Sequence, residues 1–291
     1  MSIRPTIAIF SLLCSFATGQ QQPSSCPICD AWNAPQSPFR IYGNTYYVGP
    51  HGLSSILITS EAGDVLIDGG LPESAAQIAN HIRQLGFRIE DVKLIVNSHV
   101  HFDHAGGISE LQRFSGARVA ASKWTAQVMT KTGVGRDDPQ FGIIPPIALI
   151  KHVEVLSDGQ TFKIGPIAIT ARLTPGHTPG GTSWTWKSCE GAKCLSFVYA
   201  DSLTAVSADG FKFSSVPTAI QNFQKSFSFL RSVPCEVLLT AHPDISKFWG
   251  RVEARANGVK PDPMVDTAAC RDLADRAEDA FRKRIASETA Q

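Results

Sequence analysis

Short blocks of apolar and alternating positions along the chain predict a succession of strands and helices. The strand patterns cover residues 41–48, 54–59, 64–67, 92–96, 161–164, 167–171, 183–186, 195–200 and 236–240. The helical patterns cover residues 73–85, 105–114, 123–131, 217–230 and 267–286. Because each of the two runs of strands is followed by helices, we expect an α/β protein in which helices cover both outer faces of two packed sheets.

The N-terminal segment has the pattern of a secretory signal peptide. Arg4 precedes an apolar stretch at residues 7–16, and the small residues Ala17 and Gly19 follow it. We therefore expect a signal peptide over residues 1–19 and one domain over residues 20–291, because no repeat or linker divides the rest. The apolar stretch is short for a membrane span, so we expect an exported, periplasmic protein with no stable membrane association.

The charge balance excludes a large class of partners. The chain has 27 Lys and Arg against 26 Asp and Glu. Residues 1–19 contain one of these charges, Arg4, so 26 of each sign remain after it. A neutral body of this kind does not predict a surface for polyanions, and we expect no binding of nucleic acid.

Six cysteines follow residue 19, an even number that favours disulfides in an oxidising compartment. The sequence leaves their connectivity open, although proximity favours Cys189 with Cys194 across a hairpin loop. A bond from Cys235 to Cys270 would tie the C-terminal helix to a late strand. Cys26 and Cys29 have the spacing of a redox motif, but no helix is expected after them, so a disulfide is the preferred interpretation.

Four side chains that can bind a metal lie within six residues, directly after the apolar strand at 92–96: His99, His101, Asp103 and His104. His99 and His101 are two residues apart, so in extended chain they point the same way. Imidazole and carboxylate are ligands that zinc accepts. The alternative interpretation is a polar turn in which Asp103 and His104 only cap the next helix.

Two further histidines also lie just beyond predicted strands. His177 follows the strand at 167–171 in a Pro- and Gly-rich turn, and His242 follows the strand at 236–240. Active sites of α/β proteins gather at strand ends. This shared context predicts that both histidines complete a site for two metals.

The motif His99-x-His101-x-Asp103-His104, with Gly176-His177 and Ala241-His242, resembles the metallo-β-lactamase superfamily. The resemblance implies an αββα metallo-β-lactamase sandwich: two mixed sheets packed face to face, with helices on both outer faces and two zinc ions at one edge. Asp68, in Leu66-Ile67-Asp68-Gly69-Gly70, matches an aspartate that supports the metal-binding loop in this superfamily.

The similarity is greatest to secreted class B β-lactamases of subclass 3, on the histidines of the motif and on the segment Tyr199-Ala200-Asp201-Ser202-Leu203-Thr204. It implies a first zinc on His99, His101 and His177, and a second zinc on Asp103, His104 and His242.

The same resemblance implies hydrolysis of the β-lactam amide of penicillins, cephalosporins and carbapenems through a metal-bound hydroxide, an activity that gives antibiotic resistance. Asp103 would be the catalytic residue that orients the nucleophile, while Ser202 and Thr204 would bind the substrate carboxylate. The expected partner is a small-molecule β-lactam substrate, and we expect a monomer.

Asp201 leaves two alternatives open. Some hydrolases of the superfamily use an aspartate in this segment to bridge both metals, and such a role would favour a lactonase or thioester hydrolase. The resemblance to β-lactamases instead implies that Ser202 faces the site and that Asp201 supports the loop. A third hypothesis, a secreted metal-binding protein without activity, is disfavoured because all six ligand positions are intact.

Overall fold

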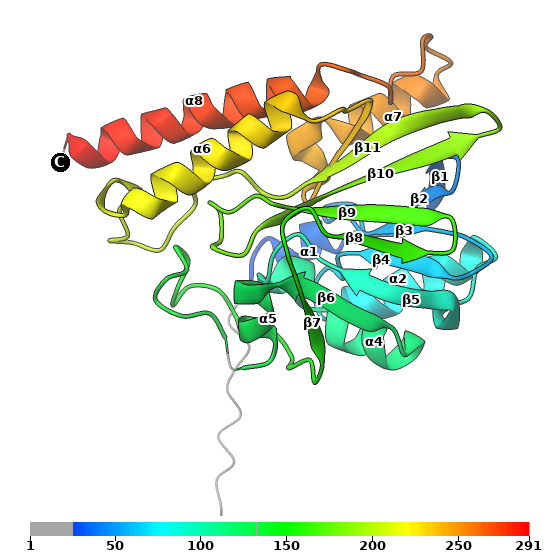
Figure 1. Ribbon diagram of the computed structural model, residues 1–291, viewed down its shortest axis with the longest axis horizontal. Helices are drawn as coiled ribbons and strands as arrows, with labels where there is room; N and C mark the ends of the chain where they lie inside the picture. The colour runs from blue at the N-terminus through cyan, green and yellow to red at the C-terminus, as the bar shows by residue number, and fades with distance from the viewer. Residues whose placement is uncertain (1–25, 132, 291) are drawn as a thin grey trace, which may run out of the picture.

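Two β-sheets pack face to face in the computed structural model, which describes residues 26–131 and 133–290 (Figure 1). The predicted signal peptide at residues 1–19 lies outside the described residues. The first sheet has seven strands in sequential order: β1 (Phe39–Tyr42), β2 (Thr45–Tyr47), β3 (Ile56–Ile58), β4 (Asp64–Ile67), β5 (Val92–Val96), β6 (Arg118–Ser122) and β7 (Val153–Leu156). Its pairs are antiparallel from β1 to β4 and parallel from β4 to β7.

The second sheet has five strands in the order β12-β11-β10-β9-β8 and is also mixed. Its members are β8 (Thr161–Ile164), β9 (Ile167–Leu173), β10 (Thr182–Glu190), β11 (Lys193–Ala200) and β12 (Val237–Thr240). Only the pair of β11 with β12 is parallel, because a helical connection separates these two strands in the chain.

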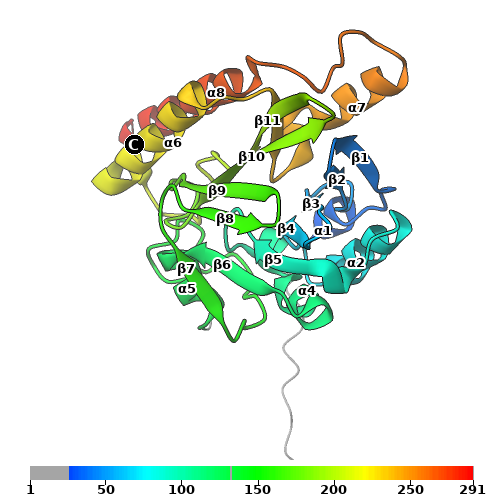
Figure 2. The same ribbon diagram turned by 45° about the vertical axis from the view of Figure 1, so that its right-hand side comes forward.

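Helices cover both outer faces, as Figure 2 shows most clearly. The helices are α1 (Cys29–Trp32), α2 (Ser74–Gln84), α3 (Phe102–Ala105), α4 (Ile108–Ser115), α5 (Lys123–Met129), α6 (Pro217–Ser232), α7 (Phe248–Ala256) and α8 (Ala269–Thr289). Apolar residues of α2, α4 and α5 pack on the seven-stranded sheet, and those of α6 and α8 pack on the five-stranded sheet. The predicted αββα sandwich is confirmed.

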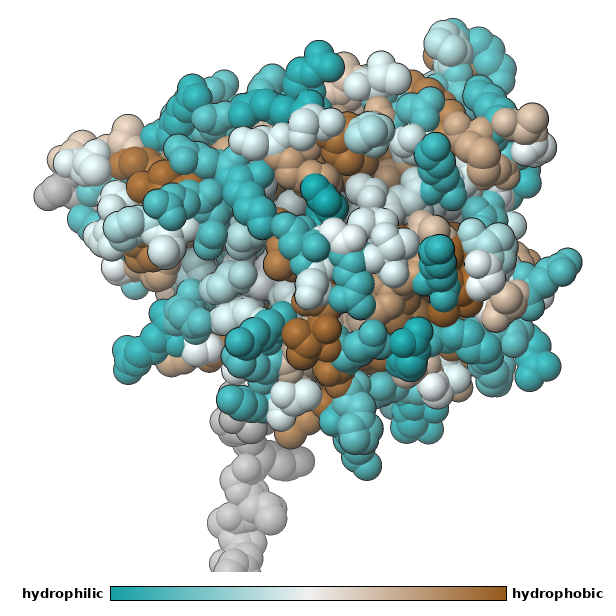
Figure 3. All heavy atoms as spheres, in the orientation of Figure 1, coloured by the Kyte–Doolittle hydropathy of each residue, from teal (hydrophilic) through white to brown (hydrophobic). Residues whose placement is uncertain are grey.

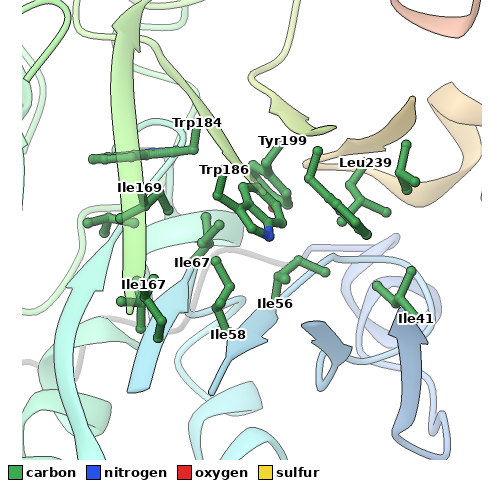
Figure 4. Packing of buried hydrophobic residues seen from close by; sticks show 14 of the residues in the cluster. Ile41, Ile56, Ile58, Ile67, Ile167, Ile169, Trp184, Trp186, Tyr199 and Leu239 are labelled. Atoms are coloured by element: carbon green, nitrogen blue, oxygen red, sulfur yellow. The ribbon is translucent and has the colours of Figure 1, made fainter. Parts of the chain in front are cut away.

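The two faces of the seven-stranded sheet pack against different layers, so successive side chains along a strand enter different parts of the core. Along β4, Val65 and Ile67 face the second sheet, whereas Leu66 faces the helices. Trp184 and Trp186 of β10 fill the space between the sheets (Figure 4). The Trp184 Nε1–H also donates to the carbonyl of Asn97 at 2.9 Å, which fixes the chain just after β5.

The outer surface is largely polar where it is seen in Figure 3, including the upper edge over α6 and α8. Arg231 of α6 pairs with Asp275 and Glu278 of α8, and its bond to Asp275 is 2.7 Å long. These charges cover the helices on the side that faces water, so the charged pattern at 267–286 belongs to a solvated helix face.

The three disulfides join Cys26 to Cys29, Cys189 to Cys194, and Cys235 to Cys270. Cys189 and Cys194 are directly opposite each other in the β10–β11 hairpin. Disulfides persist in oxidising compartments, so the bonds indicate an extracytoplasmic location. None of the described helices is long and apolar enough to cross a membrane.

Strands β4, β5 and β8 have the predicted bounds, but the helix expected at 105–114 is two helices, α3 and α4. Gly106 and Gly107 separate them. A Cβ atom on Gly106 would lie 2.2 Å from the carbonyl oxygen of Phe102, and one on Gly107 would lie 2.3 Å from that of Gly69. The backbone at Gly106 lies so close to α3, and that at Gly107 so close to the segment after β4, that only glycine fits.

Other differences also arise from local packing. The strand expected at 41–48 is the β1–β2 hairpin, which turns at Gly43 with φ of 52°. The expectation that no helix follows Cys29 is wrong, because α1 forms one turn there, closed by a bond from Trp32 N to Ile28 O. The sequence pattern missed β6 and α7; β6 contains two alanines, which are weak strand formers.

Asp64 at the start of β4 lowers the stability of the fold at neutral pH. Its side chain is buried, with 3% of the residue exposed, and it accepts a bond from Ser60 N at 3.1 Å. Burial raises the pKa of Asp64 to about 6, and the nearby Asp91 carboxylate adds to the effect. Because the folded state prefers the neutral acid, the cost is absent at acid pH and complete above about pH 6.

We therefore predict that Asp64→Asn raises the free energy of unfolding at pH 8 by about 1 kcal/mol, a figure reduced for solvent screening. The gain should shrink at pH 5, as measured by urea unfolding at both pH values. Asp158→Asn is the matched control. Burial opposes ionisation of Asp158, but the N–H of Leu173 and the ammonium of Lys225 outweigh it and lower its pKa. This variant should lose stability at pH 8, and a gain there would contradict the argument.

Candidate metal centre

The loops after β5, β9 and β12 bring the six predicted ligand residues to one edge of the sandwich. His99 and His101 follow β5, Asp103 and His104 lie in α3, His177 follows β9, and His242 follows β12. Two overlapping groups have potential ligand atoms within 4.8 Å of one another: His99 with His101 and His177, and His99 with Asp103 and His104.

His242 lies beside the second group. Its Nε2 is 3.2 Å from Nε2 of His104 and 3.3 Å from Oδ2 of Asp103. The structure therefore brings all six predicted ligand residues together, with three of them, Asp103, His104 and His242, turned toward a common point.

Asp68 holds the chain that carries the first histidines. This residue follows β4 in the left-handed region, with φ of 60°, a conformation that costs on the order of 1 kcal/mol for a residue with a side chain. Its carboxylate accepts bonds from Ser98 N at 2.6 Å, Ser98 Oγ at 2.7 Å and Tyr199 Oη at 2.7 Å. Oδ2 also lies 3.6 Å from Nδ1 of His104. The strained turn thus joins both sheets to the segment before His99.

Three histidines each turn one ring nitrogen to an oxygen outside the centre. Nδ1 of His99 lies 2.8 Å from Oδ1 of Asp201, and Nδ1 of His177 lies 2.8 Å from the carbonyl oxygen of Thr204. Nε2 of His101 lies 3.2 Å from Asp138. The other nitrogens of His101 and His177, Nδ1 and Nε2 respectively, converge on one point, since they lie 3.4 and 3.3 Å from the same atom, Gln140 Nε2.

The donor set fits metal ions. Within the described part of the chain, the buried Nε2 of His99 has no hydrogen-bond partner. A buried nitrogen without a partner costs free energy, and a metal ion at this point would satisfy it. Neutral imidazoles and one carboxylate are zinc ligands, so the residues fit the two zinc ions expected from the sequence.

Burial and neighbouring histidines keep part of the cluster neutral. Burial lowers the pKa of His99 well below its usual value and that of His177 to about 3. Burial likewise raises the pKa of Asp201 well above its usual value. The imidazoles of His99 and His177 are therefore neutral, which is the form that binds a metal, at neutral pH.

The second group has the opposite electrostatics. Burial opposes a charge on His104, but the Asp103 and Asp68 carboxylates outweigh it and raise the pKa of His104 to about 10. Burial also opposes ionisation of Asp103, yet His104 and His242 hold its pKa well below the usual range. Without metal, this group holds a proton that a zinc ion has to displace.

A cavity of about 200 Å³ opens beside the two groups. Its apolar wall contains Trp32, Phe102, Ile144, Leu203, Val206 and Ile245. Asp201, Ser202 and Thr204, which follow β11, also line it, and Asp201 in addition lies within hydrogen-bond distance of His99. Among the described residues, no lysine or arginine lines this cavity.

Sequence reasoning missed three residues here. Trp32 of α1 lies 5.3 Å from the His242 ring, measured between ring centres. Asp138 contacts His101, and Nε2 of Gln140 lies 3.4 Å from His101 Nδ1 and 3.3 Å from His177 Nε2. The segment 132–150 lacks a periodic pattern, and its one signal is the acidic pair Asp137-Asp138 before a proline.

Known proteins with this architecture have related sequences. A family model described as the metallo-β-lactamase superfamily matches residues 48–192. The solved structure of the Rm3 metallo-β-lactamase is 52% identical, with a TM-score of 0.88 over 91% of this chain and 100% of that chain. MEM-A1, a subclass B3 metallo-β-lactamase from a soil metagenome library, is 49% identical, with a TM-score of 0.86 over 89% and 99% of the two chains.

Curated proteins match over a shorter region. The N-acyl homoserine lactonase of Bacillus thuringiensis is 26% identical over 150 residues, which cover 44% of this chain and 55% of the lactonase. The chain thus spans about half the length of the curated relatives it matches.

The two groups should differ in how acid affects zinc binding. Because the metal displaces a proton from His104, the affinity of the second group should fall about tenfold per unit as pH is lowered from 8 to 6. His99 and His177 are already neutral in this range, so zinc binding to the first group should weaken less. Each group is tested by itself: His177→Ala leaves the second group intact, and His104→Ala leaves the first. The zinc that each variant retains after dialysis against buffered free zinc gives its affinity at each pH. Equal pH dependence in both variants would contradict the electrostatic assignment.

Proposed function

The chain belongs to the metallo-β-lactamase superfamily, and we propose that it is a zinc-dependent β-lactamase of subclass B3 that opens the β-lactam amide of penicillins, cephalosporins and carbapenems. The observation that carries the proposal is the pair of metal-binding groups that open into a cavity with Ser202. Similarity to B3 enzymes at about half identity over about nine-tenths of the chain supports it.

The proposed ligands divide between two zinc ions. The first would bind His99, His101 and His177, and the second would bind Asp103, His104 and His242. When bound, the two ions would supply Lewis acids for the lactam carbonyl and amide nitrogen, and a nucleophile near neutral pH. Three imidazoles for one ion, and two imidazoles with a carboxylate for the other, are zinc ligand sets.

Asp103 is the proposed catalytic carboxylate. Its Oδ2 lies 3.2 Å from His104 Nε2 and 3.3 Å from His242 Nε2. These histidines outweigh the effect of burial and hold the pKa of Asp103 low, so it remains ionised and able to accept a hydrogen bond from the attacking water. A carboxylate held in this way orients the water toward the substrate carbonyl.

Ser202 and Thr204 are the proposed partners of the substrate carboxylate. Nδ1 of His177 lies close to two oxygens of Thr204: the hydroxyl Oγ1 at 3.1 Å and the carbonyl oxygen at 2.8 Å. The Thr204 hydroxyl is therefore already in contact with a proposed zinc ligand. Ser202 also lines the cavity, and its side chain takes part in none of the hydrogen bonds between described residues. Ser202 is therefore the more available donor, and Asp68 and Asp201 act through the histidines that they hold.

The apolar wall would exclude water from the reacting amide and contact the apolar substituents of the substrate. Trp32, Ile144, Val206 and Ile245 come from four different segments around the opening. Burial of such groups against an apolar substituent contributes to binding in proportion to the area covered.

A lactonase acting on acyl homoserine lactones is the second candidate, because curated lactonases match part of the chain. An aspartate that bridges both metals would favour it. The hydrogen bond between Nδ1 of His99 and Oδ1 of Asp201 supports the β-lactamase instead, since it gives Asp201 a supporting place beside that ligand.

The biological setting belongs to the same proposal. We infer that residues 20–291 form the mature domain, that the protein acts in the periplasm as a monomer, and that it confers antibiotic resistance. The disulfides support export. Because the positive and negative side chains beyond residue 19 balance, the zinc ions would be the charges that attract an anionic substrate.

We predict that the zinc-loaded protein hydrolyses a chromogenic cephalosporin, a penicillin and a carbapenem, and that a chelator abolishes all three activities. Absorbance assays with the purified protein measure this directly. Hydrolysis of an acyl homoserine lactone alone, with intact β-lactams, would overturn the β-lactamase and favour the lactonase.

Asp103→Asn should lower kcat about 100-fold or more, because an amide is a poor acceptor for the water proton. His101→Ala should lower it similarly by removing a ligand of the first group. Circular dichroism should show that both variants keep the fold. Near-normal turnover in either variant would refute the assignment of the centre.

Ser202→Ala should raise KM about tenfold for substrates with a carboxylate, the loss expected for one hydrogen bond to a charged group. Because the bond serves binding, kcat should change much less. Ser232→Ala, at the end of α6 and outside the cavity lining, is the control and should leave both constants unchanged. An unchanged KM for Ser202→Ala would remove Ser202 from the substrate site.

A further inference from the structure

Asp138 is a buried carboxyl group on a segment without regular structure, and the reaction as proposed above gives it no role. Its residue is 0% exposed. Its Oδ1 and Oδ2 lie 3.3 and 3.2 Å from Nε2 of His101, and Oδ1 also accepts a bond from Gln140 N at 2.7 Å. These are its side-chain hydrogen bonds within the described chain.

The segment is held firmly on both sides of the metal centre. Asp138 N donates to the carbonyl of Gly135 at 3.0 Å, and Ala208 N donates to the carbonyl of Pro139 at 2.8 Å. The latter bond links this segment to the one that follows Ser202 and Thr204. Asp138 therefore has a defined position relative to both His101 and the cavity.

We propose that Asp138 is a positioning residue that fixes the tautomer of His101. It would hold the ring proton on Nε2 and so leave Nδ1, which faces the cluster, free to bind the first zinc. The proposal rests on the zinc centre of the proposed function.

Burial makes this role specific. A carboxylate removed from water is costly unless charged or polar groups satisfy it. The Nε2–H of His101 and the N–H of Gln140 supply that satisfaction. The opposite tautomer of His101 would set an unprotonated ring nitrogen against the two carboxyl oxygens, which are acceptors, and would leave both groups unsatisfied.

The variant Asp138→Asn reverses this preference at nearly constant volume. Its Oδ1 would keep the short bond from Gln140 N, so its NH₂ group would face His101 Nε2. An NH₂ group requires an acceptor, which moves the ring proton of His101 to Nδ1, where it competes with zinc. Asp137→Asn is the matched control, because it makes the same substitution one residue earlier. The Asp137 side chain is exposed and accepts a hydrogen bond from Trp124 Nε1, not from a histidine.

Zinc affinity is measured by competition with a chromogenic chelator in a His242→Ala background, where the first ligand set alone is complete. Adding Asp138→Asn should weaken zinc binding about 10- to 100-fold, and adding Asp137→Asn should change it less than about twofold. A dissociation constant for Asp138→Asn that stays within twofold of its background overturns the proposal.

A second measurement needs no variant and decides the matter if Asp138→Asn does not fold. Ring-nitrogen NMR of the zinc-loaded wild-type protein should show the proton of His101 on Nε2 and the metal-bound nitrogen as Nδ1. The reverse assignment overturns the proposal. Neither the zinc affinity nor the NMR assignment depends on β-lactam hydrolysis. An inactive wild-type protein would therefore refute the proposed function, and these two measurements would still decide the role of Asp138.

Discussion

The buried carboxylate of Asp68 is the interaction on which the rest of the structure depends. It lies at the end of β4 in the seven-stranded sheet and accepts a bond from Tyr199 of β11 in the other sheet. It also accepts two bonds from Ser98, directly before His99. One side chain thus ties the two sheets together and fixes the start of the metal-binding segment. The positive φ of Asp68 is the local cost of that arrangement.

The metal centre extends the same principle outward. His99, His101 and His177 each contact an oxygen that faces away from the cluster, on Asp201, Asp138 and Thr204 respectively. These oxygens come from segments far apart in the chain. The core that packs the sheets therefore also sets which nitrogen of each ring faces the metals, and Trp184 contributes directly by holding Asn97.

Much of the fold and the ligand set could be predicted from the sequence, because both depend on short-range patterns. Short apolar or alternating runs predicted the bounds of β4, β5 and β8, and the spacing of His99 to His104 indicated a metal site. Asp138 could not be found in this way: it reaches His101 across 37 positions from a segment without period. Likewise, β6 is a strand because it pairs with β5 and β7 on either side. Its two alanines do not themselves favour a strand, so the sequence pattern did not predict it.

The most direct test is anomalous diffraction at the zinc edge from crystals of the zinc-loaded protein. The account predicts two peaks. One should lie about 2.0–2.1 Å from His99 Nε2, His101 Nδ1 and His177 Nε2, and the other should have Asp103, His104 and His242 as ligands. Asp201 should remain bonded to Nδ1 of His99. A single peak, or a carboxylate of Asp201 that bridges two zinc ions, would contradict the account.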